Sequence, residues 1–205
     1  MSKLETNTID TVSGSNTLTL GSTNTSTISV GSPISNGLTL SDNILFDTAD
    51  KGIYLGTTTA TASNLLDDYE EGTWSPAYTN NTNNLVVTHS VQDGYYKKIG
   101  NIVFITGEIR TSSVTPSANW IKLDNLPFTM DTSTGSSGGG ITINLATDFG
   151  ANYPIMGYGT NSSGINGFIL QYRDASDGAT AFINPSDLST TLTNKIFFSG
   201  FYHAN

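Results

Sequence analysis

Pairs of apolar residues separated by one polar residue recur through the first third of the chain. Leu18-Thr19-Leu20, Ile28-Ser29-Val30 and Leu38-Thr39-Leu40 are spaced ten residues apart, and each is followed by Gly or Ser. Alternation with period two is typical of a strand with one buried face, and the small residues that follow favour an immediate turn. The pattern therefore predicts a shaft of very short β-strands over residues 17–63.

Such a shaft needs partners, because each short strand offers only two inward side chains. Burying one of them stabilises by roughly 1.5–3 kcal/mol, whereas ordering the backbone costs about 1–2 kcal/mol per residue. We expect identical chains to bury this face about a common axis. The predicted shaft core comprises Leu18, Leu20, Ile28, Val30, Leu38, Leu40, Ile53 and Leu55. A disordered linker is the alternative, since Ser, Thr, Gly and Asn are abundant there.

The segment before the shaft, residues 1–16, has apolar residues too sparse for a helix or a core strand. It is interpreted as a docking segment or a frayed end. Residues 57–63 contain no large apolar side chain and mark the end of the shaft.

After Gly72 the chain changes to aromatic-rich segments with turn-rich loops between them, and no helical period of comparable strength is present. Many short strands at this spacing favour an antiparallel β-sandwich or jelly-roll over residues 73–205. The last strand is apolar almost throughout, so we expect it to be central or buried at a subunit contact. The predicted strands are 73–79, 85–91, 94–99, 102–111, 120–123, 141–146, 167–173, 180–184 and 196–202.

Four carboxylates cluster between the shaft and the sandwich, at Asp67, Asp68, Glu70 and Glu71. Paired carboxylates serve glycosidases and hard cations, but a catalytic pair normally comes from separated elements. The segment 64–72 is therefore interpreted as an acidic hinge, a solvated turn that caps a short helix from Asn64. A cation site and a catalytic pair remain as alternatives.

Two motifs around this hinge resemble the junction found in tail-fibre and other virion fibre proteins of bacteriophages, especially marine ones. The first motif is Leu65-Leu66-Asp67-Asp68-Tyr69-Glu70-Glu71-Gly72-Thr73-Trp74-Ser75-Pro76, and the second is Tyr95-Tyr96-Lys97-Lys98-Ile99-Gly100-Asn101-Ile102-Val103. The resemblance covers residues 64–107. It implies a homotrimeric fibre, with the shaft intertwined from three chains and a C-terminal head.

Composition narrows the possible functions. The chain has 205 residues, of which 36% are hydrophobic, and 17 Asp and Glu against 8 Lys and Arg. This acidic excess argues against nucleic-acid binding. The absence of cysteine excludes disulfides and thiolate sites. With no secretory signal or membrane span in the sequence, we expect synthesis in the host cytoplasm and no membrane insertion.

The remaining motifs give weak signals for chemistry. His89 and His203 lie in different predicted strands, without acidic residues at ligand spacing, and are interpreted as surface or interface residues. Residues 174–178 resemble the start of a calcium loop, but the register places Pro185 where the bidentate Glu belongs, so a hairpin turn is predicted. The glycine-rich run at 135–140 lacks the Lys of a phosphate loop.

Aromatic residues on polar loops give the candidate recognition site. Tyr153 and Tyr158 lie among Gly, Asn and Ser, and Tyr172 and Trp120 are expected to join the same surface. Rings on adaptable loops suit stacking on host glycans. The alternative is that these rings fill the sandwich core or the trimer interface.

The sequence thus predicts a non-enzymatic fibre on the virion surface, without catalytic residues, metal or cofactor. Its expected partners are two further copies of itself, another virion protein bound through residues 1–16, and a glycan or protein of the host surface. A capsid-anchored head fibre or decoration protein is the alternative. A polysaccharide depolymerase spike is less favoured, because the shaft is short and poor in acids.

Overall fold

The structure is a computed structural model that describes residues 43–46, 51–55, 59, 61, 64–80, 82, 85–115, 119–131, 138–160, 166–176 and 178–205. The chain divides into two compact units, Met1–Leu45 and Phe46–Asn205, and all named strands belong to the second. Most of the predicted shaft, including its core residues from Leu18 to Leu40, and the docking segment 1–16 lie outside the described residues. The trimeric shaft stays a prediction.

The regular elements of the described part are β-strands and one short 3-10 turn, η2 (Pro185–Asp187), which confirms the all-β prediction. A small sheet pairs β1 (Ile53–Tyr54) with β2 (Leu65–Leu66). Exposed Ile53 and Leu55, both predicted shaft residues, lie in and beside β1. The large sheet contains β3 (Tyr69–Trp74), β4 (Ala77–Asn80), β5 (Val86–Ile99), β6 (Ile102–Thr115), β7 (Ile121–Asp124), β8 (Gly139–Thr147), β9 (Met156–Thr160), β10 (Gly167–Arg173), β11 (Thr180–Phe182) and β12 (Lys195–His203).

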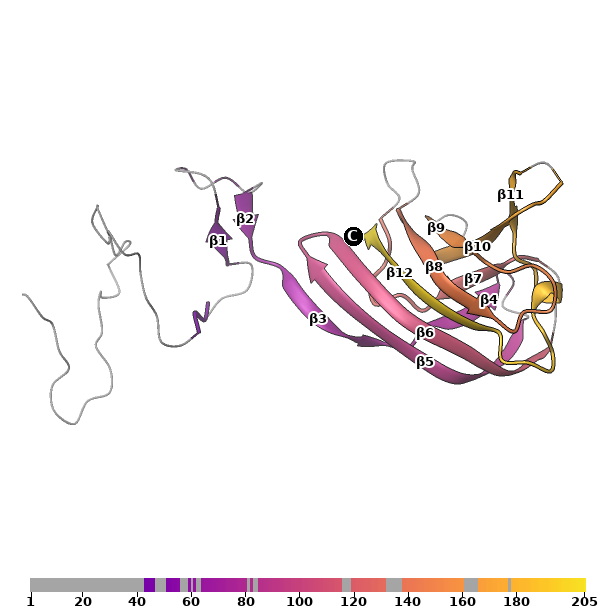
Figure 1. The fold of residues 1–205 in the computed structure, drawn as a ribbon. Coiled ribbons are helices and arrows are strands. Elements are labelled where there is room, and N and C mark those ends of the chain that lie inside the picture. Colours follow the sequence, from indigo (N-terminus) through magenta and orange to yellow (C-terminus); the bar gives the residue numbers. More distant parts are fainter. Residues whose placement is uncertain are drawn as a thin grey trace, which may run out of the picture. The chain divides into compact units, whose positions relative to one another are not determined.

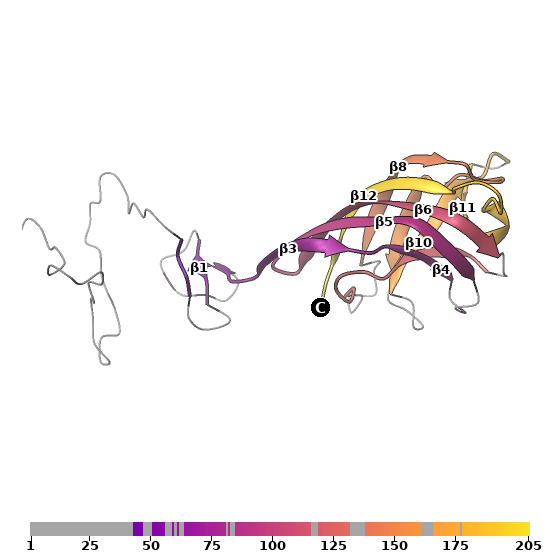
Figure 2. The same ribbon diagram turned by 90° about the horizontal axis from the view of Figure 1, so that it is seen from below.

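The large sheet is antiparallel throughout and runs in the order β3-β5-β6-β12-β8-β9-β10-β7-β4, with β11 added beside β10. Its two end strands, β3 and β4, are joined by Ser75 and Pro76 alone, so the sheet must curl until its ends meet. In Figure 1 the strands β7, β9 and β10 accordingly lie behind β5, β6, β12 and β8, and Figure 2 shows the same curl from below. The jelly-roll connectivity of the head stays a prediction.

Side chains of β5 close the seam between the two ends of the sheet. The backbone N–H of Tyr78 donates to His89 Nε2 at 3.1 Å, and Gln92 Nε2 donates to the carbonyl of Pro76 at 2.9 Å. The Tyr78 N–H and the Pro76 carbonyl are backbone groups that would pair with a neighbouring strand in a regular sheet; here side chains of β5 satisfy them instead. His89 is therefore a half-buried seam residue.

The core lies between the two layers of the curled sheet. Phe198 of β12 meets Trp74 of β3 edge to face, with ring centroids 6.0 Å apart, and Tyr202 meets Phe168 of β10 at the same distance. As predicted, β12 is central, between β6 and β8. Val103, Ile105 and Ile109 share the buried face of β6, because side chains an even number of positions apart in a strand point to the same side.

Several predicted strand limits differ from the structure. The segment 73–79 is broken at Ser75-Pro76, because proline has no N–H for the ladder. The break predicted between the strands 85–91 and 94–99 is wrong, because β5 runs through it. Gly94 fits at this point since a Cβ would overlap the indole of Trp74. Strand β9 was not predicted: its alternating glycines, Gly157 and Gly159, resemble loop sequence.

The interpretation of residues 64–72 as a solvated turn with a helix cap is corrected by the structure. Tyr69–Trp74 form β3, which pairs with β5 so that Glu70 opposes Lys98 and Glu71 opposes Lys97. The first strand of the large sheet thus begins before the predicted boundary at Gly72. Glu71 forms an ion pair with Lys97, and Glu70 accepts a hydrogen bond from the Tyr96 hydroxyl, so each carboxylate has a partner on β5.

Candidate functional site

One residue from each strand along the sheet path lies in register on the outer face, in a row that crosses the whole sheet. Each member has neighbours along its own strand that point inward; Phe104, for example, lies between buried Val103 and Ile105. From β3 to β4 the row is Glu71, Lys97, Phe104, Phe201, Gly140, Tyr158, Ile169, Lys122 and Thr79.

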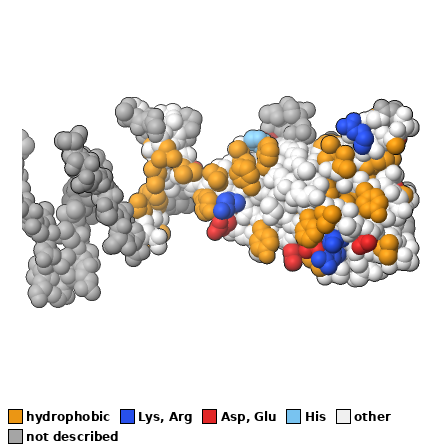
Figure 3. Space-filling model, in the orientation of Figure 1, with side chains coloured by type: hydrophobic (Ala, Val, Ile, Leu, Met, Phe, Trp, Pro, Cys, Tyr) orange, Lys and Arg blue, Asp and Glu red, His pale blue; other side chains and the backbone are white. Residues whose placement is uncertain are grey.

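The first part of this row belongs to an apolar outer surface, which we call the aromatic face. Its members are five exposed apolar side chains of β3, β5, β6 and β12 near this part of the row: Tyr69, Tyr95, Ile99, Phe104 and Phe201. Figure 3 shows hydrophobic side chains across this side of the molecule, with basic and acidic groups beside one another among them. A hollow of about 470 Å³ lies in this surface between Tyr95, Lys97 and Phe104. Such an uncovered apolar surface is typical of an interaction site.

The charged groups on the aromatic face neutralise one another. Lys97 Nζ lies 3.2 Å from Glu71 Oε2, and the Tyr69 hydroxyl donates to the same oxygen at 2.8 Å. The hydrogen bond from Tyr69, followed by the one from Lys97, lowers the pKa of the Glu71 carboxyl. The hydrogen bond to Glu71 in turn raises the pKa of Lys97. The face therefore carries little net charge in a strongly acidic chain.

The second part of the row carries another aromatic group. Phe182 of β11 lies between Tyr158 and Trp120, with ring centroids 6.4 Å from each. Beneath them Ile169 is only 3% exposed, although it points away from the inner core. We call Trp120, Tyr158 and Phe182 the ring cluster; it covers Ile169 and forms a second apolar surface on the outside of the sheet.

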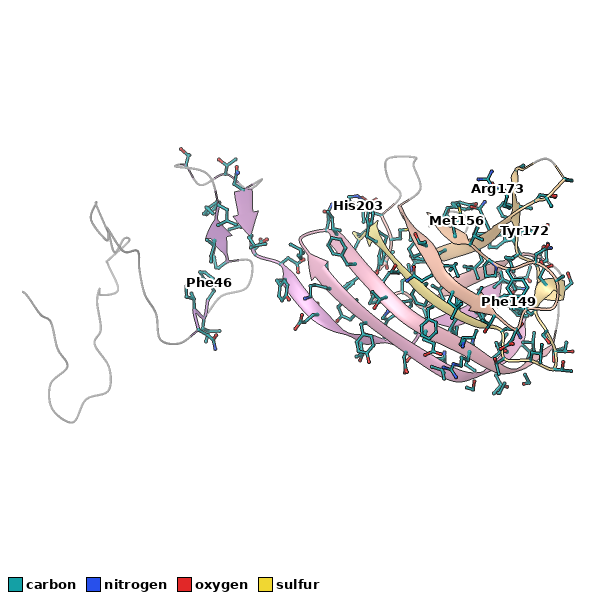
Figure 4. All side chains as sticks on the ribbon, viewed as in Figure 1. Phe46, Phe149, Met156, Tyr172, Arg173 and His203 are labelled. Carbon is teal, nitrogen blue, oxygen red and sulfur yellow. The ribbon has the colours of Figure 1, made fainter. Side chains whose placement is uncertain are left out.

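The structure brings together two of the four predicted recognition residues. Tyr158 and Trp120 both contact Phe182, which the sequence analysis did not single out. Tyr172 neighbours Gln171 on β10 and points to the other side, where it packs against the core. Tyr153, 45% exposed, lies before β9 and contacts Phe149; Figure 4 labels Phe149 and Tyr172.

The titratable side chains of the described ranges are scattered over the sheet. These ranges contain no group of three or more His, Asp or Glu side chains that could hold a metal ion. Burial lowers the pKa of His89, whose Nε2 accepts the Tyr78 N–H, and His203 lies far along the sheet on β12. Within the same ranges, no helix is long and apolar enough to cross a bilayer.

The alternation of inward and outward side chains along a strand could have identified residues of the aromatic face that the sequence analysis did not single out. Phe104 and Phe201 alternate with buried residues, which marks them as outward rings. Their pairing with each other depends on which strands are neighbours, and that is set by the tertiary fold.

No protein-family model, curated protein or solved structure matches this chain.

Proposed function

We propose that this protein is a non-enzymatic, homotrimeric structural fibre of a bacteriophage virion, located on the virion surface, whose C-terminal sheet domain attaches to the host. The observation that carries the proposal is the aromatic face. Five large apolar side chains, each more than 40% exposed, lie together on strands β3, β5, β6 and β12. No described residue covers them, and further copies of the same chain would remove those of β3, β5 and β6 from water, with Phe201 of β12 at the edge of the contact.

The pairing of β3 with β5 supports the virion assignment. The two motifs that resemble phage fibre junctions are adjacent antiparallel strands, joined by opposed pairs such as Glu71 and Lys97. Asp68 also bonds Lys98, which is 8% exposed. The motifs therefore form one structural unit at the start of the sheet domain. The assignment to a phage still depends on the resemblance of these residues.

The ring cluster supports a role in attachment. Trp120, Tyr158 and Phe182 present an aromatic surface outside the aromatic face, on β11, β9 and beside β7. Aromatic rings at a surface are suited to host glycans. A capsid-anchored head fibre or decoration protein shares these features and is the alternative; it differs in which virion protein holds residues 1–16.

Two measurements test the proposal. Light scattering on the full chain at micromolar concentration is expected to give three times the mass of one chain. Electron microscopy of virions labelled with antibody against the sheet domain is expected to show label on fibres, and its position on tail or capsid separates the two alternatives. A monomer in solution, or virions without label, would reject the fibre function.

A further inference from the structure

Gly140 interrupts the outward row of side chains between two aromatic rings. It pairs with Phe201 of β12 on one side and with Tyr158 of β9 on the other. Because a glycine has no side chain, the row is open at this point. The opening is part of a groove of about 610 Å³ along β8, which we call the Gly140 groove.

Packing does not require a glycine at this position. A Cβ on Gly140 would meet only the carbonyl oxygen of Gly157, at an ordinary 3.6 Å, and its φ is not positive. Its neighbour Gly139 differs, because a Cβ there would overlap the backbone of Phe201. Packing therefore requires a glycine at position 139. It does not require one at position 140, where the glycine leaves the floor of the groove free of side-chain atoms.

The spacing of the two strand positions leaves room for a six-membered sugar ring. Adjacent strands are about 4.8 Å apart, so the backbone positions of Phe201 and Tyr158, two strands apart, are separated by roughly 10 Å. A pyranose ring between them can place its C–H groups against an aromatic face. Both walls are supported from behind: Phe201 by Phe104, at 6.3 Å between centroids, and Tyr158 by Phe182, at 6.4 Å. Rings already held in place lose little freedom on binding.

The lining of the groove also indicates the charge of its ligand. Among the described residues that line it, none is Asp, Glu, Lys or Arg. Polar groups come from Thr142 and His203, toward opposite ends of the groove along the strands, and Figure 4 labels His203 together with Met156, which pairs with Thr142. A mainly apolar site with a few polar groups is typical of small-ligand binding.

We propose that the Gly140 groove binds a neutral hexopyranose ring, stacked between Phe201 and Tyr158 over the Gly140 backbone. This inference rests on the proposed attachment function and names the class of receptor. Of the four recognition residues that the sequence predicted, only Tyr158 lines this groove.

A graded series of substitutions at Gly140 tests the groove in the full chain. Binding of methyl α-glucopyranoside, methyl α-mannopyranoside and methyl β-galactopyranoside is measured by saturation-transfer NMR and calorimetry. We expect at least one to bind, Gly140→Ala to weaken it, and Gly140→Val to weaken it at least about tenfold. Gly150→Ala is the matched control, because a Cβ there also makes only ordinary contacts; its affinity should equal that of the unsubstituted chain.

Three results would overturn the proposal: none of the glycosides binds, Gly140→Val binds as well as the unsubstituted chain, or the corresponding glucuronide binds more tightly than the glucoside. If Gly140→Val does not fold, Tyr158→Leu and Phe201→Leu replace it, since they keep apolar bulk and remove the stacking face. A change of molecular mass in these variants would assign the groove to contacts between copies instead. The fibre function is judged separately, by light scattering and virion labelling.

Discussion

Phe104 on β6 and Phe201 on β12 are direct cross-strand partners, with ring centroids 6.3 Å apart and exposed fractions of 46% and 48%. Such pairs stabilise a sheet even at its surface. Both rings nevertheless leave about half of their area in water. Phe201 is a member of the aromatic face and also lines the Gly140 groove, so the two surfaces are adjacent at this ring.

Replacing Phe104 with Asp is expected to weaken self-association without unfolding the sheet domain. The new carboxylate would be desolvated in the proposed contact between copies, and the concentration for half-dissociation should rise at least about tenfold. Light scattering over a dilution series measures this. Val86→Asp is the control, because Val86 is 62% exposed at the start of β5, away from the aromatic face. Equal effects of the two substitutions would remove the aromatic face from the interface.

A chain shortened to residues 67–205 is expected to fold, whereas one shortened to 73–205 should be less stable by about 2 kcal/mol or more. The shorter chain loses the first part of β3 and leaves Lys98, 8% exposed, without Asp68. Urea denaturation followed by circular dichroism measures the difference. Equal stability of both chains would show that the acidic segment does not contribute to the sheet domain.

Asn194→Ala is expected to destabilise the sheet domain by about 2–3 kcal/mol. The buried amide of Asn194 donates to Thr111 Oγ1 at 2.9 Å, and its oxygen accepts the Ser189 N–H at 2.7 Å. Its φ of 36° also favours asparagine over alanine. Asn144→Ala, on the exposed side of β8, is the control and should cost less than about 0.5 kcal/mol. Denaturant midpoints compare the two.

The free energy of unfolding is expected to decrease as the pH falls from about 7.5 to about 5.5, in part because of His89. Burial lowers the folded-state pKa of His89 below the ordinary 6.5, so the unfolded chain binds the proton first. The stabilisation is complete above pH 6.5 and is lost as the pH falls toward the folded-state value. Protonation of Nε2 would also break the bond from the Tyr78 N–H.

His89→Gln should reduce this pH dependence, because the amide oxygen can accept the same bond without titrating in this range. Thermal denaturation at both pH values gives the comparison. An unaltered slope in His89→Gln would show that carboxylates alone cause the acid sensitivity.

Tyr172→Ala is expected to lower stability by about 3 kcal/mol, whereas Tyr158→Ala should change it by less than half as much. Tyr172 packs against the core, while Tyr158 lies on the outer face. Adsorption of phage carrying each substitution supplies the second measurement. Only Tyr158→Ala is expected to lower adsorption while the domain stays folded.

The sequence by itself determined the all-β character of the sheet domain and the faces of its best-defined strands. Period-two alternation places Val103, Ile105 and Ile109 on one face of their strand, because successive side chains in a strand point to opposite sides, and in the structure that face is the buried one. The last strand is apolar almost throughout, which led us to expect it to be central or buried at a subunit contact, and β12 is central. These properties depend only on residues close together in the chain.

The tertiary structure alone decided which strands are neighbours, and therefore which residues meet on the outer face. Phe104, Phe201, Gly140 and Tyr158 are far apart in sequence, and only the order β6-β12-β8-β9 brings them into one row. The carboxylates of Glu70 and Glu71 likewise have partners because β5 supplies the Tyr96 hydroxyl to Glu70 and Lys97 to Glu71. Strand order is set by long-range packing and the return of the chain from β3 to β4, which short-range patterns do not encode.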